Sequence, residues 1–311
     1  MAFSWKLCGT NFMINSYPKI YNLGHKELAN LFTGVVHVEE KIDGSQFSMM
    51  LDHNGGLVCR SKGVQINPDD PGMFNKAVAT ARELASNGKL TQGWVYRCEY
   101  LQSYKHNTIA YEREPLKNLV LFDVELSAGS ETYANRDQKR AIALDLGIDV
   151  APWIDVLFTP NCARVKAMAD ELQTRKSLLG GPLPPEGLVF KNYDQFGADK
   201  KILIGKYVRP EFREDNKDKW NAEKRGRTSA AILDTLTERF ATEARWKKAI
   251  QHLRDAGKLE QSMRDIPALM NEIPSDIETE CRREIEDALW AHFWPQLRRS
   301  VTKGLPEFYK D

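Results

Sequence analysis

The residues with the clearest chemical potential lie around one lysine. In the segment VEEKIDGSQFS, residues 38–48, Lys41 ends an apolar run, Asp43 follows two positions later, and Gly44 supplies a turn. Two glutamates precede the lysine, so acidic groups flank one primary amine. An amine is a nucleophile only when neutral, which requires burial or nearby cations to lower its pKa. Taken alone, the segment is more typical of an exposed hairpin with charged edges.

Further chemically capable side chains follow in a fixed order along the chain. Each lies at the end of an apolar run or within one, and such runs predict short strands. These residues are Arg60, Lys62, Glu99, Phe122, Asp123, Glu186, Lys191 and Lys206. Each feature is weak alone, and the ordered set carries the interpretation.

This ordered set resembles the covalent nucleotidyltransferase superfamily of ATP-dependent DNA and RNA ligases and mRNA capping enzymes. Within it, the set is most similar to the nick-sealing RNA ligases of phages and of the kinetoplastid editing type, over about residues 35–214. The resemblance implies that Lys41 attacks the α-phosphate of ATP to form lysyl-AMP. AMP then moves to a 5′-phosphate, and a 3′-hydroxyl displaces it. Lys206 matches the lysine whose charge stabilises the transition state at the α-phosphate.

The resemblance also implies contacts with the nucleotide. Glu40 matches an adenine-recognising position, and Phe122 matches the aromatic side chain that stacks on adenine. Arg60 matches an arginine that contacts ribose and phosphate, although a shift of two residues would give this role to Lys62. Glu99 matches the acidic residue that holds the ribose hydroxyl.

Metal and phosphate contacts follow from the same resemblance. Glu186 matches the carboxylate near the catalytic metal, and Lys191 matches a second lysine on the phosphate side, while Asp43 and Gly44 complete the set that binds ATP. Glu99 and Glu186 are the implied metal ligands. The six histidines form no HxH or HExxH pattern typical of zinc, so the implied cofactors are ATP with Mg²⁺ or Mn²⁺.

The chain departs from the nick-sealing pattern near Lys206 and near the nucleophile. Val208 stands where these ligases usually carry a second lysine. Arg209 could substitute, although a one-residue offset on a strand turns the side chain to the opposite face. Asp43 stands where several close relatives carry His. Gln46 stands where DNA ligases usually carry Arg, which favours an RNA ligase.

The pattern of apolar residues predicts an α+β domain over residues 1–220, for which the resemblance implies antiparallel sheets with flanking helices. Two apolar runs around residues 52–56 predict a hairpin. Helices are expected near 72–87, over 136–146 before Gly147, and near 161–178. Strands are expected over 94–100, 119–124, 187–191 and 202–204.

Residues 221–311 carry helical spacing and predict a small all-helical domain. Ser275–Glu278 is typical of a capping box that begins a helix, and Pro295 should end or kink that helix. DNA ligases and capping enzymes carry a β-barrel domain at this place, so a helical tail favours nick-sealing RNA ligases. The basic stretch 217–227 is typical of either a phosphate-contacting segment or a solvated hinge.

Composition excludes several classes of protein. The chain has 311 residues, five scattered cysteines and a formal net charge of +1. The odd cysteine count argues against a disulfide framework. No apolar run is long enough for a membrane span, and the first residues lack a signal-peptide layout. We therefore expect a soluble cytoplasmic protein, in the host cytoplasm if the chain is viral.

The sequence leaves some alternatives open. An ATP-dependent DNA ligase, a capping-type guanylyltransferase and a non-catalytic nucleic-acid-binding relative all share parts of the pattern. The expected partner is nicked RNA or an RNA-containing duplex, and the sequence does not determine the oligomeric state.

Overall fold

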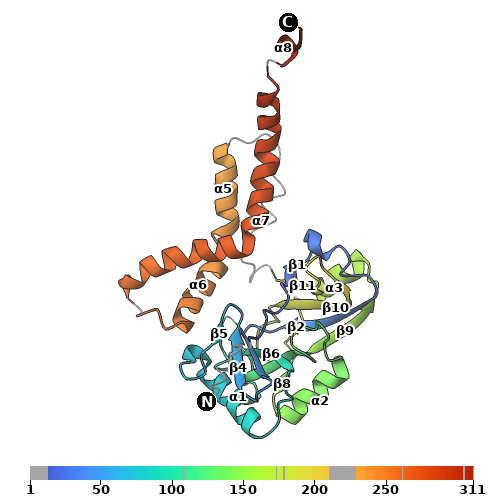
Figure 1. Cartoon of the computed structure of the whole chain (residues 1–311), viewed down its shortest axis with the longest axis vertical. Coiled ribbons are helices and arrows are strands. Elements are labelled where there is room, and N and C mark those ends of the chain that lie inside the picture. Colours follow the sequence, from blue (N-terminus) through green and yellow to red (C-terminus); the bar gives the residue numbers. More distant parts are fainter. Residues whose placement is uncertain are drawn as a thin grey trace, which may run out of the picture. The chain divides into compact units, whose positions relative to one another are not determined.

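The computed structural model describes residues 13–107, 109–172, 174–177, 179–209, 229–260, 262–303 and 305–310. The chain divides into two compact units, Met1–Phe212 and Arg213–Asp311, which are described separately. The first contains two β-sheets with helices beside them, and the second is helical in its described part (Figure 1). In these described residues, no helix combines the length and apolar character needed to cross a membrane.

The first sheet has five strands, in which β1 and β11 are parallel and the other pairs antiparallel. One face packs against α3, Cys162–Leu172, through a core that includes Val38, Phe190 and Met168. In spatial order the strands are β1 (Tyr21–Asn22), β11 (Ile202–Val208), β10 (Gly187–Phe196), β2 (Val35–Lys41) and β9 (Trp153–Phe158).

The second sheet has six strands and carries two helices on its outer face (Figure 1). These are α1, Asn75–Ser86, and α2, Arg136–Leu146, whose apolar faces bury the largest core of the unit. The strands are β5 (Gln65–Ile66), β4 (Leu57–Ser61), β3 (Ser45–Leu51), β6 (Val95–Tyr100), β7 (Leu119–Glu125) and β8 (Asp149–Val150).

Several predicted elements are confirmed. The hairpin is formed by β3 and β4, with Leu51 opposite Leu57. Helix α2 begins at a capping box formed by Asn135 and Gln138 and ends at Gly147, whose φ of 65° is left-handed. The predicted antiparallel sheets with flanking helices are also present, apart from short parallel pairings at β1 and β8.

The second unit contains α5 (Ser229–Phe240), α6 (Glu243–Asp255), α7 (Ile266–Val301) and α8 (Leu305–Lys310). Its core joins one face of α5 to Ile277, Cys281 and Ile285 of α7. The predicted helix start at Ser275 is wrong, because α7 begins at Ile266 and continues through both Pro274 and Pro295. Ser275, expected to cap the helix, lies inside α7, and the neighbouring Asp276 pairs with Arg245 of α6. The basic stretch 217–227 lies outside the described residues.

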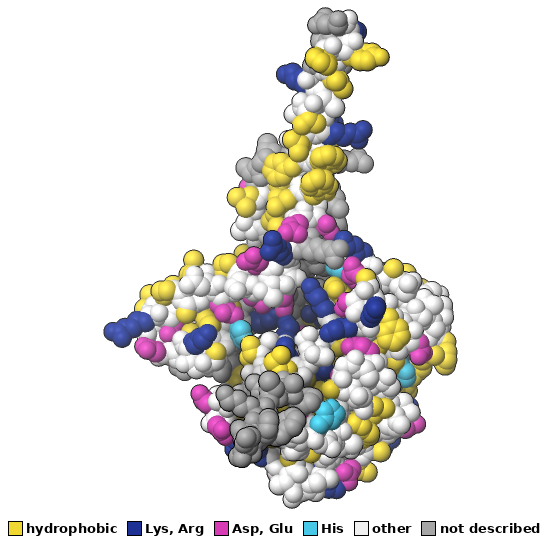
Figure 2. Space-filling model, viewed as in Figure 1, with side chains coloured by type: hydrophobic (Ala, Val, Ile, Leu, Met, Phe, Trp, Pro, Cys, Tyr) yellow, Lys and Arg dark blue, Asp and Glu magenta, His cyan; other side chains and the backbone are white. Residues whose placement is uncertain are grey.

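The C-terminal part of α7 exposes large apolar side chains. Trp290 and Trp294 stack with ring centroids 4.8 Å apart, and their residues are 63% and 42% exposed. Leu297 and Val301 continue this exposed stripe. Figure 2 shows hydrophobic side chains along this helix in yellow.

Candidate active site

Lys41 lies at the end of β2, where strand pairing brings it to Glu186. Gly187, the first residue of β10, is paired with Lys41, so the preceding Glu186 lies beside the lysine. The Lys41 ammonium group donates a hydrogen bond to Glu186 Oε2 over 2.6 Å. The two side chains are 23% and 13% exposed, so they are partly buried yet open to solvent.

Glycine is required at the start of β10 by a close approach of the backbone. A Cβ atom at Gly187 would lie 2.0 Å from the carbonyl oxygen of Tyr207 on β11. Any larger residue would force β10 and β11 apart and move Glu186 away from Lys41. The close approach of β11 therefore explains why a glycine, Gly187, directly follows Glu186.

Strand register places Lys206 on the same sheet face as Lys41. Val189 of β10 is paired with both Glu39 and Lys206, while Gly187 is paired with Lys41. Since directly paired residues share a face and side chains alternate along a strand, Glu39, Lys41 and Lys206 point to one side. Burial raises the pKa of Glu186, and Lys41 and Lys206 are among the charges that oppose this rise.

The second sheet contributes Glu99, from β6, to the same charge cluster. Burial raises the pKa of Glu99 to about 8; Lys41 opposes this shift, whereas Glu186 and Asp43 add to it. Three carboxyl groups and Lys41 therefore interact electrostatically, although they come from separate strands and turns. The structure thus gathers the central residues of the sequence prediction into one site.

The protonation of Lys41 differs from the sequence expectation. Burial lowers its pKa, as expected, but the negative charges of Glu186 and Glu99 outweigh burial, and the pKa is raised. In the absence of other cations, Lys41 is therefore an ammonium group. The expected neutral amine requires that these carboxylates be neutralised.

The donor chemistry around Lys41 fits a divalent cation held jointly with a nucleotide. No cluster of three or more His, Cys, Asp or Glu side chains suited to a metal occurs within the described residues. Mg²⁺, however, is usually bound by one or two carboxylates together with water and substrate phosphates. Glu99 and Glu186 are two such carboxylates. Burial raises the pKa of each although Lys41 opposes the shift, so a bound cation would favour their charged forms.

Asp43 and Gly44 shape the turn that follows Lys41. Asp43 is buried and accepts hydrogen bonds from the Asn107 side chain at 3.0 Å and the Ile109 backbone N–H at 2.8 Å. A Cβ atom at Gly44 would lie 3.0 Å from the Tyr100 carbonyl oxygen. In this structure both residues hold the turn against β6 and the neighbouring loop.

The remaining predicted nucleotide contacts differ in their surroundings. The buried Glu40 carboxylate accepts a hydrogen bond from Ser177, on the sheet face opposite Lys41. The Arg60 guanidinium donates to the Gly63 carbonyl over 3.1 Å. Lys62 lies close enough to Glu99 to lower its pKa. The roles of these three residues toward a nucleotide remain predictions.

Phe122 lies where the two sheets meet. Its half-buried side chain packs against one apolar cluster that contains Ile42 and another that contains Val189. The Tyr17 ring contacts it edge-on, with centroids 5.0 Å apart. An aromatic ring between the lysine turn and β10 is suitably placed to stack on a base.

Lys191 does not extend into an open phosphate site. Its residue is 2% exposed, and its ammonium group bonds to Glu39 Oε2 at 2.8 Å and the Phe122 carbonyl oxygen at 2.7 Å. Asp123 Oδ2 lies 3.1 Å away. A lysine has three donors, and these three protein groups account for all of them. The phosphate contact implied by the resemblance therefore requires a different arrangement of this side chain.

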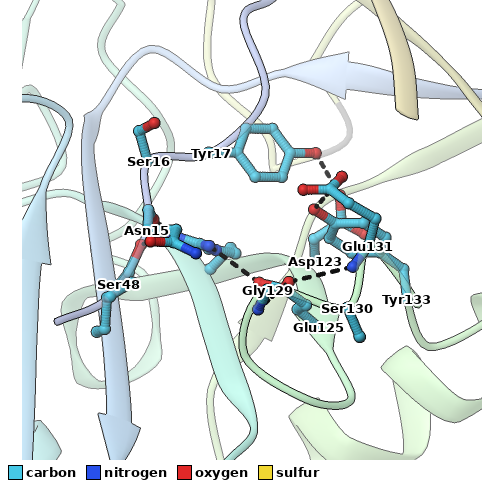
Figure 3. Close-up of polar contacts among 12 residues, drawn as sticks. Asn15, Ser16, Tyr17, Ser48, Asp123, Glu125, Gly129, Ser130, Glu131 and Tyr133 are labelled. Atoms are coloured by element: carbon cyan, nitrogen blue, oxygen red, sulfur yellow. Dashed lines mark hydrogen bonds and ion pairs between the residues drawn. The ribbon is translucent and has the colours of Figure 1, made fainter. Parts of the chain in front are cut away.

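Sequence reasoning missed several members of a buried polar network around Asp123. The Asp123 carboxylate accepts hydrogen bonds from the hydroxyls of Tyr17 and Tyr193. Figure 3 shows the Tyr17 contact, with Tyr133 nearby. Lys139 on α2 is also buried and pairs with Glu39. Its position on the buried face of α2, one turn before Ala143, is a sequence signal that could have identified it.

A second buried ion pair contacts the segment around Asn15, and Figure 3 labels Asn15 and Glu125. Arg97 pairs with Glu125 at 3.1 Å and donates to the Asn15 carbonyl over 2.8 Å. Glu125 also accepts from the Gly129 backbone N–H over 2.7 Å. These contacts hold residues near Tyr17 against the second sheet and so support the surroundings of Phe122.

Comparison with known protein families gives one match over the region just described. A family model described as RNA ligase matches residues 34–208, which is more than half of the chain and includes the residues from Lys41 to Lys206. No curated protein sequence matches this chain.

The solved structures that this chain is similar to include ligases. An archaeal ATP-dependent RNA ligase has 15% sequence identity and a TM-score of 0.46, with 88% of this chain and 65% of that chain covered. A Naegleria gruberi RNA ligase mutant with ATP and Mn has 15% identity and a TM-score of 0.46, covering 67% and 62%. An Aquifex aeolicus protein assigned as an ATP-dependent DNA ligase has 14% identity and a TM-score of 0.43, covering 86% and 68%. The chain thus spans less than two thirds of the two RNA ligases.

Proposed function

Because this chain belongs to the RNA ligase family, we propose that it is an ATP-dependent RNA ligase that joins 3′-hydroxyl and 5′-phosphate ends. The observation that carries the proposal is the contact of 2.6 Å between Lys41 and Glu186, inside the matched region. Lys206 on the same sheet face and Glu99 from the second sheet complete a charge cluster suited to phosphate chemistry. A binding module would have no need for such an amine.

In the proposed first step, Lys41 Nζ attacks the α-phosphorus of ATP. The new N–P bond forms as the bond to the β-phosphate oxygen breaks, and pyrophosphate leaves. Lys41 must lose a proton, and Glu186 is the acceptor within hydrogen-bond distance. Lys206 stabilises the negative charge that develops on the phosphate oxygens. A divalent cation, when bound with the nucleotide, supplies charge that offsets Glu99 and Glu186.

The later steps complete the ligation. AMP passes from Lys41 to a 5′-phosphate end, so that the N–P bond breaks and a pyrophosphate linkage forms. A 3′-hydroxyl then attacks the activated phosphate, AMP leaves, and a phosphodiester results. We assign base stacking to Phe122 and the ribose contact to Glu99, with Glu40, Arg60 or Lys62 as further nucleotide contacts.

The proposed partner is nicked RNA or an RNA-containing duplex, acted on in the cytoplasm. We assign ATP chemistry to residues 1–220 and polynucleotide engagement to residues 221–311. The family match supports the first assignment, since it lies within that range.

A panel of nicked duplexes tests this function. Each duplex carries a 5′-phosphate at the nick and RNA or DNA on either strand, and joining is read on a denaturing gel with ATP, GTP or no nucleotide. We expect ATP-dependent joining of duplexes with RNA at the nick. Preferential joining of all-DNA nicks would favour a DNA ligase, transfer from GTP would favour a capping-type enzyme, and binding without joining would favour a non-catalytic relative.

A further inference from the structure

Phe122 is the extra residue of a bulge between β6 and β7. Arg97 is paired with Asp123 and Cys98 with Leu121, which leaves Phe122 without a paired residue on β6. A bulge interrupts the alternation of side chains and turns the extra residue to a new direction. Here the bulge lets Phe122 face the junction of the two sheets, while its neighbour Leu121 remains in the core beneath α1 and α2.

Two lysines from different elements converge on the backbone of this bulge. The Phe122 carbonyl oxygen accepts hydrogen bonds from Lys139 Nζ at 2.9 Å and Lys191 Nζ at 2.7 Å. Both lysines also pair with Glu39, and Lys191 pairs with Asp123 as well. Two cations and two anions, all nearly excluded from solvent, therefore surround one carbonyl group.

Burying these four charged groups carries a larger desolvation free energy than burying apolar side chains would. Removing charged groups from water carries a desolvation penalty that their mutual attraction often only offsets, so stability alone is a weak reason to keep them. The two lysines do constrain geometry, because hydrogen bonds from both of them fix the position of the Phe122 carbonyl. The Lys191 ammonium also lies 5.3 Å from the centroid of the Phe122 ring.

We propose that Lys139 and Lys191 are positioning residues that hold the Phe122 bulge, so that the Phe122 ring is fixed for stacking on the base of the bound nucleotide. This inference rests on the proposed function and extends it to α2, outside the residues that the sequence indicated. It also gives Lys191 a role other than the phosphate contact implied by the resemblance.

The ATP dependence of Lys41 adenylylation tests the proposal. In Lys139→Met, we expect the ATP concentration for half-maximal rate to rise about tenfold, the scale of one weakened base–aromatic stack. The rate at saturating ATP should change little, because the phosphate groups are handled elsewhere. The exposed neighbour gives a matched control, and Arg140→Met should behave as wild type. Lys191→Met should likewise raise the half-maximal ATP concentration and leave the rate at saturating ATP almost unchanged. Loss of a lysine that contacts phosphate would instead lower the rate at saturating ATP.

A double-mutant cycle separates positioning of Phe122 from a general structural effect. Once Phe122→Leu has removed the stacking ring, adding Lys139→Met should not raise the half-maximal ATP concentration further. If Lys139→Met does not fold, Glu39→Gln combined with Lys139→Met removes one charge of each sign and takes its place. An unchanged ATP dependence in a folded variant, additive effects in the cycle, or unfolding of both variants would overturn the proposal. Absence of an adduct in the wild type would instead refute the proposed function.

Discussion

The ammonium group of Lys41 and the carboxylate of Glu186 lie 2.6 Å apart, joining the end of β2 to the residue before β10. This pair makes Glu186 the nearest proton acceptor for the proposed nucleophile. It also keeps Lys41 charged until other cations enter the site, since Glu186 is the strongest of the charges that raise its pKa.

We predict that Glu186→Gln lowers the pKa of Lys41 in metal-free protein, because it removes a negative charge that raises this pKa. The neutral amine should then become abundant at a lower pH than in the wild type. The rate of acetylation of Lys41 by acetic anhydride, followed against pH by peptide mass spectrometry, measures this shift. A profile that moves to higher pH would contradict the electrostatic account.

The same variant should lose adenylylation despite its more readily deprotonated lysine. Glutamine cannot accept the proton, and loss of a general base typically costs about 10²-fold or more. Single-turnover formation of protein–AMP with excess ATP measures this rate. Wild-type rates would remove Glu186 from the proposed proton transfer.

Lys206→Ala should slow protein–AMP formation by about 10²–10³-fold, the effect of losing one preorganised group that stabilises a transition state. Lys206→Arg should restore part of the rate, because the charge is kept. The exposed Lys200 provides a control, and Lys200→Ala should match the wild type. If Lys206→Ala were equally active, the α-phosphate charge would have to be stabilised by another residue.

Arg209 is expected to act on the position of Glu186. Its guanidinium donates to the carbonyls of Pro185 at 2.6 Å and Pro184 at 3.2 Å, and its backbone N–H donates to the Glu186 carbonyl at 3.0 Å. Arg209→Ala removes the guanidinium donors to Pro185 and Pro184 but keeps the backbone N–H, so we predict a loss of about 1–3 kcal/mol in the free energy of unfolding. Denaturant titration measures this loss.

Kinetic assays separate this positioning of Glu186 from the role that the sequence suggested for Arg209, which was to replace the second lysine missing at position 208. A displaced Glu186 should slow protein–AMP formation, whereas sealing of a pre-adenylylated nick should change less. The opposite pattern would show that Arg209 contacts the polynucleotide phosphate instead.

A chain ending near residue 225 should still form protein–AMP but should seal nicks poorly. The residues that gather around Lys41 all belong to the first unit, whereas the helical unit is assigned to the polynucleotide. Parallel assays of adduct formation and nick sealing, on protein shown to be folded by circular dichroism, test this division. Sealing as efficient as that of the full chain would refute it.

The positions of the strands along the chain could be predicted because apolar runs and turns are local patterns, and the family resemblance implied that the charged residues share one site. Apolar runs on either side of residues 52–56 marked the hairpin, and the run 187–191 marked the first half of β10. Strand pairing then brought Lys41, Glu186 and Lys206 to one place.

Features that depend on tertiary packing were not predictable in the same way. The bulge at Phe122 depends on how β6 pairs with β7, and the buried partners of Lys191 come from β2 and β7. The start of α7 was misplaced because Ser275 and Glu278 have the spacing of a capping box. In the structure both lie inside a longer helix, where the neighbouring Asp276 pairs with Arg245.

Peptide mapping of the protein after incubation with ATP and Mg²⁺ tests the central claim most directly. The account predicts a single AMP adduct on the peptide that contains Lys41, labile in acid, lost in Lys41→Ala and kept in a variant of the exposed Lys166, Lys166→Ala. An adduct on another residue, or one that persists in Lys41→Ala, would contradict the account.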